Sequence, residues 1–193
     1  KEQQQTETTI NSVDEESTPQ VDIVQQQPKK LTREEVKALI QQDAQSSVQQ
    51  FVQRYSKSKT MYAVIYEKYG GPSVLEMRDD VQIPELDDKR RVLIQVHFAS
   101  VNPVDYKIRA GYLRMFYKAL FPMIPGQDAA GIVVKSSTDN FKEGDRVFGY
   151  VESGRTFAEY AACDPAELAT VPDEMSLAEA SCLPTVGLAT YQS

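Results

Sequence analysis

Hydrophobic and polar positions follow two different periods along the chain, and the first of these is helical. Between residues 31 and 55 the apolar side chains recur every three or four positions: Val36, Ile40, Ala44, Val48, Phe51 and Tyr55. This spacing places them on one face of an α-helix. Thr32 followed by Glu35 is the signature of a helix N-terminus called a capping box. We therefore predict one amphipathic helix over residues 31–57.

From Met61 onward the period changes to two, which is typical of strands. Short alternating runs separated by glycine and charged residues predict strands at 61–67, 74–78, 92–99, 130–135, 146–150 and 156–162. Short strands at this spacing indicate a small barrel or sandwich, so the fold class is mainly β. Ser176 with Glu179 forms a second capping box and predicts a helix across residues 177–191.

The first thirty residues show neither period. They contain few apolar side chains and no aromatic ones, so we expect a disordered, glutamine-rich arm over 1–30. The chain divides into this arm, the helix at 31–57 and a β domain at 61–193. Lys1 is not a methionine, which leads us to expect processing or a longer reading frame upstream.

The apolar stripe of the 31–55 helix must be covered, and three partners are considered. The stripe packs on the following domain, or it docks a partner protein. A membrane surface is the least favoured, because the polar face carries mainly Gln and Ser rather than Lys and Arg.

Composition narrows the function classes. With 21 basic and 28 acidic residues, the net charge is −7 and no Lys/Arg-rich run occurs, which argues against nucleic-acid binding. No apolar run approaches the ~18–20 residues of a membrane-spanning helix, so no membrane insertion is expected. Cys163 and Cys182 are interpreted as small buried side chains and His97 as structural. We expect an intracellular protein, cytoplasmic, or organellar if a targeting segment was removed upstream of Lys1.

Four segments taken together resemble a known family. They are 99–111 (ASVNPVDYKIRAG), 124–133 (IPGQDAAGIV), 141–149 (FKEGDRVFG) and 179–192 (EASCLPTVGLATYQ). In this order they are similar to the N-terminal half of a zinc-free, quinone-oxidoreductase-like medium-chain dehydrogenase/reductase. The resemblance implies a GroES-like, partly open barrel with short helices, and an NADP(H)-dependent reduction of quinones, enones or related activated alkenes.

The same resemblance has implications for zinc binding and for the role of Asn102. Zinc-dependent relatives carry Cys and a His-Glu pair where this chain has Asn102 and Gln127-Asp128, so no zinc is expected. By resemblance, Asn102 lies beside the nicotinamide, where its amide can bond a carbonyl or a ribose.

The remaining site residues are also assigned by resemblance. Lys107 and Tyr112 are candidate catalytic groups beside Asn102, and Asp105 and Thr185 join Asn102 as cofactor-binding candidates. Lys107 stands where many quinone reductases have Tyr. A salt bridge to Asp105 or a position on a solvated helix face is an equal alternative to the catalytic role of Lys107. Tyr112 has core or rim packing as its alternative.

The nucleotide-binding part of the family is not recognisable in the chain. No G-x-G-x-x-G or A-x-G-G-x-G occurs, so we expect a catalytic domain truncated before the dinucleotide-binding domain and inactive alone. Two hypotheses remain open. One is the N-terminal part of a longer reductase. The other is a non-catalytic structural or interaction subunit, either a homo-oligomer or part of a larger assembly joined through the 31–55 helix.

Overall fold

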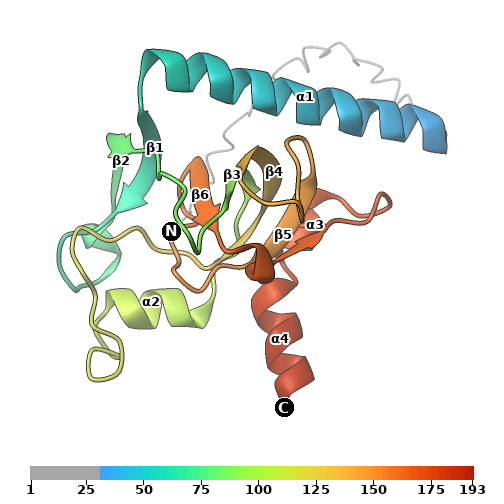
Figure 1. Cartoon of the computed structure of the whole chain (residues 1–193). Helices are drawn as coiled ribbons and strands as arrows, with labels where there is room; N and C mark the ends of the chain where they lie inside the picture. Colours follow the sequence, from blue (N-terminus) through green and yellow to red (C-terminus); the bar gives the residue numbers. More distant parts are fainter. Residues whose placement is uncertain (1–30) are drawn as a thin grey trace, which may run out of the picture. The chain divides into compact units, whose positions relative to one another are not determined.

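The computed structural model describes residues 31–193; the arm expected at 1–30 lies outside the described residues. The described residues form two antiparallel sheets (Figure 1). The smaller sheet pairs β1 (Thr60–Ile65) with β2 (Glu76–Gln82). The larger sheet has the order β6-β3-β4-β5-β7. Its strands are β3 (Val92–Phe98), β4 (Asp128–Ser136), β5 (Arg146–Tyr150), β6 (Tyr160–Cys163) and β7 (Leu168–Thr170). The mainly β prediction with short helices is confirmed.

The first helix, α1 (Arg33–Lys57), begins where the capping box predicts. The Thr32 hydroxyl accepts from the Glu35 amide at 3.2 Å, and the Glu35 carboxylate accepts from the Thr32 amide at 2.8 Å. The helix buries Ala44, Ser47 and Phe51 against the β domain that follows it. Of the three possibilities considered for covering the apolar stripe, the structure therefore shows packing against the chain's own β domain.

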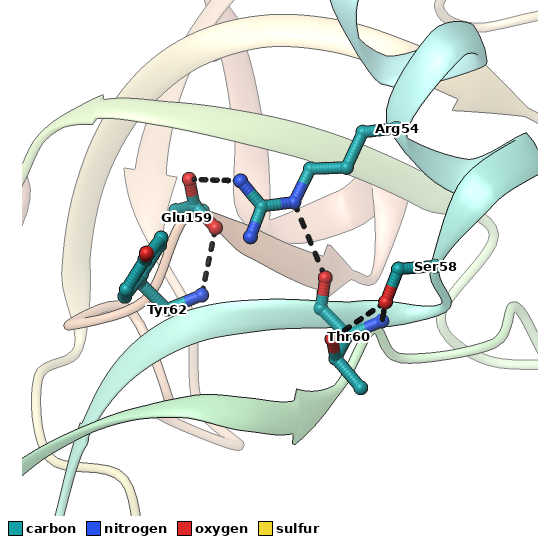
Figure 2. A network of polar contacts seen from close by, with 5 residues as sticks. All are labelled: Arg54, Ser58, Thr60, Tyr62 and Glu159. Carbon is teal, nitrogen blue, oxygen red and sulfur yellow. Dashed lines mark hydrogen bonds and ion pairs between the residues drawn. The ribbon is translucent and has the colours of Figure 1, made fainter.

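A network of polar contacts joins the C-terminal end of α1 to the β domain (Figure 2). Arg54 donates to the Thr60 carbonyl oxygen at 3.2 Å and to the Glu159 carboxylate at 3.1 Å. The other carboxylate oxygen of Glu159 accepts from the backbone N–H of Tyr62 at 2.7 Å. Ser58 and Thr60 hydroxyls lie 2.7 Å apart at the connection itself. Because one carboxylate bonds both α1 and β1, the helix and the first strand are held at the same point.

Three local predictions need correction. The helix expected over 177–191 is two helices, α3 (Leu177–Ser181) and α4 (Pro184–Gln192), because Pro184 has no N–H to donate to the carbonyl four residues earlier and its ring clashes with that carbonyl. The strand expected at 74–78 is shifted, since η1 (Pro72–Val74) precedes β2. Strand β7 and the short helix η2 (Pro165–Glu167) were not predicted.

The centre of the larger sheet is buried on both faces. Val92, Leu93 and Ile94 of β3 are all at most 1% exposed, so the strict alternation expected for this strand is not seen. Strand β4 crosses β3 so closely that a Cβ on Gly131 would lie 1.9 Å from the Gln95 carbonyl oxygen. Only glycine fits there. The same strand pair ends with Phe98 opposite Ala130, so the first residue of β4 lies near the segment that leads from β3 to α2 (Pro103–Arg109).

Candidate active site

Asp128, the first residue of β4, is the centre of a buried hydrogen-bond network. It is 1% exposed and its carboxylate accepts four bonds. Ser100 Oγ and Asn102 Nδ2 both donate to Oδ2 at 2.9 Å. The backbone N–H of Thr185 donates to Oδ2 at 3.2 Å and its hydroxyl donates to Oδ1 at 2.7 Å. One carboxylate thus brings together three segments far apart in the sequence.

Asn102 forms the N-terminal cap of α2, and this position is fixed from two sides. Its backbone N–H donates to Asp105 Oδ2 at 2.7 Å, while its amide Nδ2 bonds Asp128 and, at 3.3 Å, Ser100. A carboxylate can only accept, so the amide nitrogen faces Asp128 and the amide oxygen faces away from that carboxylate. Two partners are predicted for this amide, a carbonyl and a ribose. The amide oxygen can accept a hydrogen bond from a ribose hydroxyl without any rearrangement of the side chain.

Asp105 is buried, and burial raises the pKa of its carboxyl group, with the charge of Asp128 adding to the shift. Hydrogen bonds from the backbone N–H groups of Asn102 and Gly126 oppose this by stabilising the ionised form. The two carboxylates of the site are therefore electrostatically coupled.

Gln127 and Tyr150 form a second pair beside the network. Gln127 Nε2 lies 2.7 Å from the Tyr150 hydroxyl, and its Oε1 is buried without a partner among the described residues. Burial raises the pKa of the Tyr150 hydroxyl, which keeps it protonated at neutral pH. Sequence reasoning missed Tyr150, because a tyrosine in a short strand carries no signal that separates it from packing.

The structure brings together only some of the predicted site residues. Asn102, Asp105 and Thr185 meet around Asp128, as just described. Lys107 and Tyr112 are exposed, the latter by 73%, and neither side chain joins this network. Asp128 itself was noted only as a replacement for a zinc ligand. Asp128 begins a run of small and apolar residues in the sequence, and this pattern could have indicated that its carboxylate is buried.

The two cysteines differ from each other. Cys163 is fully buried and burial raises the pKa of its thiol, so it is protonated at neutral pH. Cys182 is exposed, and the expectation that both cysteines are buried was wrong for this residue, because it caps the end of α3 at the break before α4.

A metal site and a membrane span were sought over residues 31–193. No group of three or more His, Cys, Asp or Glu side chains there has the arrangement of a metal site. Within the same range, no helix combines the length and apolarity that crossing a membrane requires.

The fold and the site define a class of protein. Residues 88–173 match the family described as the alcohol dehydrogenase GroES-like domain. The chain therefore contains a domain of this family, and several of the proteins that it matches are quinone oxidoreductases. The resemblance carried by the four motifs is thereby confirmed.

Individual relatives make the match specific. Quinone oxidoreductase of Sus scrofa is 39% identical over 127 residues, covering 65% of this chain and 38% of that protein. The chloroplastic NADPH-dependent alkenal/one oxidoreductase of Arabidopsis thaliana is 39% identical over 136 residues, covering 65% and 35%. The chain thus spans roughly two fifths of the length of these relatives.

Solved structures agree with the sequence matches. The quinone oxidoreductase from Coxiella burnetii superposes with a TM-score of 0.61 at 33% identity, covering 69% of this chain and 44% of that one. Escherichia coli quinone oxidoreductase complexed with NADPH gives 0.60 at 25% identity, covering 67% and 39%.

Proposed function

We propose that this chain is the N-terminal catalytic-domain part of a zinc-independent, NADP(H)-dependent oxidoreductase acting on quinones, enones or related activated alkenes. Support comes from relatives named quinone oxidoreductase and NADPH-dependent alkenal/one oxidoreductase. The chain spans only about two fifths of such proteins, and its sequence has no glycine-rich pyrophosphate turn. We therefore assign turnover to a protein that also contains the nucleotide-binding half, with the 193-residue chain inactive alone.

The observation that carries this proposal is the fixed orientation of the Asn102 amide. Its nitrogen is held by Asp128 at 2.9 Å, so the group is positioned before any ligand arrives. The amide oxygen is then suited to accept a hydrogen bond from a ribose hydroxyl of NADP(H). A substrate carbonyl needs a donor, and binding one at Nδ2 would displace Ser100 or Asp128.

The other candidates have more limited roles in the proposal. NADP(H), when bound, supplies the hydride. Thr185 and Asp105 act first on protein groups, Thr185 by bonding Asp128 and Asp105 by capping α2, so we assign them positioning of the cofactor-binding residues. Lys107 and Tyr112 are exposed and free of this network, which suits groups that meet a developing oxyanion only when substrate is present.

The test uses the protein isolated from its native source. An intact mass well above 21.7 kDa would show the additional half, and NADPH oxidation with a benzoquinone or a 2-alkenal is then assayed. Asn102→Ala should lower kcat/KM by about one to three powers of ten, the range for one positioned polar group. The control is Asn140→Ala, in the exposed loop between β4 and β5, which should retain wild-type kinetics. Unchanged kinetics in Asn102→Ala would remove this residue from the site.

A second candidate function, a subunit held in an assembly by α1, must use the outer side of that helix. The inner side is occupied by the chain's own domain, whereas Leu39 and Val52 are 52% and 58% exposed. Leu39 and Val52 lie about 140° apart around the helix axis, so we propose one of these two flanks as the contact for a protein partner or a second copy. For location we propose the cytoplasm, with an organelle as the alternative because several relatives are named chloroplastic.

A further inference from the structure

A basic and aromatic loop, which we define as residues 112–121 (YLRMFYKALF), stands out from the rest of the surface. Between Asp105 and Asp128 the sequence has no acidic residue and four basic ones, in a chain whose net charge is −7. The basic residues are Lys107, Arg109, Arg114 and Lys118. The region is therefore a local positive patch on an acidic protein.

The loop also exposes large apolar side chains. Met115 is 85% exposed, Phe116 93% and Leu120 78%. Single exposed apolar residues are ordinary, but three within six positions form a patch that soluble proteins usually cover.

The base of the loop is held firmly, so this exposure is not that of a loose end. The Tyr69 ring packs edge-on against Phe121 at 5.0 Å, and its hydroxyl accepts from the Ala119 amide at 3.2 Å. Tyr66 and Met123 exchange two backbone hydrogen bonds, each of 2.9 Å. At the other end of the loop, the backbone N–H of Tyr112 donates to the Lys107 carbonyl oxygen at 2.9 Å. Both ends of the loop are therefore held, and the exposed apolar side chains lie between them.

A second exposed apolar surface of the same chain provides a comparison. Helix α4 exposes Val186 and Leu188 by 54% and 44%, yet residues 183–193 contain no charged side chain. An uncharged apolar helix face is typical of protein contacts, whose centres are depleted of charge and especially of lysine. The 112–121 loop differs because Arg114 and Lys118 alternate with the apolar residues. Long basic side chains can lay their methylenes on an apolar phase and keep the charge at its surface.

We infer that the 112–121 loop docks the protein on an anionic phospholipid surface. Met115, Phe116 and Leu120 enter the boundary between headgroups and acyl chains, and Arg114 and Lys118 bind the lipid phosphates. The interaction is peripheral and depends on Arg114, Met115, Phe116, Lys118 and Leu120, not on Tyr112, to which the proposed function gives a role toward the substrate.

The experiment measures co-sedimentation of the full 193-residue chain with vesicles of phosphatidylcholine alone and of phosphatidylcholine with phosphatidylserine. Binding to the anionic vesicles is expected, together with a steep loss as salt rises. Arg114→Gln with Lys118→Gln should lower the partition coefficient about 30-fold, from roughly a factor of five for each charge near such a surface. Met115→Ser with Phe116→Ser should lower it at least ~10-fold.

The matched control is Met77→Ser with Val186→Ser, which removes two exposed apolar side chains elsewhere and should leave binding unchanged. Circular dichroism verifies that each variant is folded. No binding to anionic vesicles, or equal losses in the control and loop variants, would overturn the inference. A dimer in sedimentation velocity that Met115→Ser with Phe116→Ser converts to monomer would also overturn it, by assigning the loop to a second copy.

Discussion

Truncating Phe51 to alanine tests whether α1 is an integral part of the β domain. The side chain is 5% exposed and lies in the same buried cluster as Met61 and Ile83. Its ring packs edge-on against Tyr160 of β6, with the centroids 5.3 Å apart, and lies 5.3 Å from the ring of Tyr55. Phe51→Ala therefore removes a contact between α1 and the sheet and leaves a cavity between them.

The size of the effect follows from these contacts. Truncating a buried phenylalanine costs about 3–5 kcal/mol, which includes the lost burial, the cavity and the aromatic pairs. Small domains are stable by only ~5–15 kcal/mol, so this is a large share of the total. The corresponding drop in Tm is roughly 6–20 °C for a domain of this size.

Urea denaturation followed by circular dichroism and by tyrosine fluorescence measures this change, since the chain has no tryptophan. Val52→Ala is the matched control. This neighbouring residue of the same helix is 58% exposed, and its truncation should change the free energy of unfolding by less than ~0.5 kcal/mol.

An independent docking helix would behave differently. If Phe51→Ala and Val52→Ala had equal effects, both below ~1 kcal/mol, α1 would not contribute to the domain's stability. The reasoning from burial would then be refuted, and the inner side of α1 would again be available to a partner.

Three further predictions concern the site and the sheet. Asp128→Ala removes the acceptor of four hydrogen bonds, one buried and three half-buried, and should lower the free energy of unfolding by more than ~3 kcal/mol in urea denaturation; a change below 1 kcal/mol would contradict the network. Gly131→Ala forces a Cβ to 1.9 Å from the Gln95 carbonyl oxygen and should cost about 2–3 kcal/mol, whereas Gly187→Ala, with open space around it, should not destabilise. Because burial raises the pKa of Asp105 in the folded protein, its ionised form lowers stability above that pKa, and protonation removes this cost as the pH falls. Asp105→Asn should therefore be more stable than wild type at pH 7, with a gap in urea midpoint that shrinks on acidification; a gap independent of pH would refute this cause.

The parts of the fold that could be predicted from sequence are those determined by local patterns. The start of α1 at the Thr32 cap, the strand Arg146–Tyr150 and the Ser176 cap of α3 all follow from short-range chemistry. The strands predicted at 74–78 and 156–162 begin later, at Glu76 and Tyr160, because irregular backbone precedes each of them. Hydrogen bonds to a distant segment decide such a boundary. For example, Phe157 and Glu159 pair with β1 before β6 begins.

Asn102, Asp105 and Thr185 of this network could be named from the sequence, but the arrangement of the network and the place of Tyr150 beside it could not. The motif identifies Asn102, and the network confirms that it is buried among polar partners. That Asp128 would bond Thr185, 57 positions later, depends on how α3 and α4 fold back on the sheet. The Gln127–Tyr150 pair likewise depends on the register between β4 and β5, which no single segment contains.

The bonds of Thr185 to Asp128 have a mechanical consequence. Thr185 is in the first turn of α4, which extends away from the sheets in Figure 1, so this helix is fastened at its base to the same carboxylate that orients Asn102. A rotation of α4 about its first turn would stretch the two hydrogen bonds from Thr185. The Asp128 carboxylate would then shift, and the hydrogen bond from the Asn102 amide would change with it. Asp128 therefore couples the orientation of α4 to the orientation of the Asn102 amide, because the same carboxylate accepts hydrogen bonds from both.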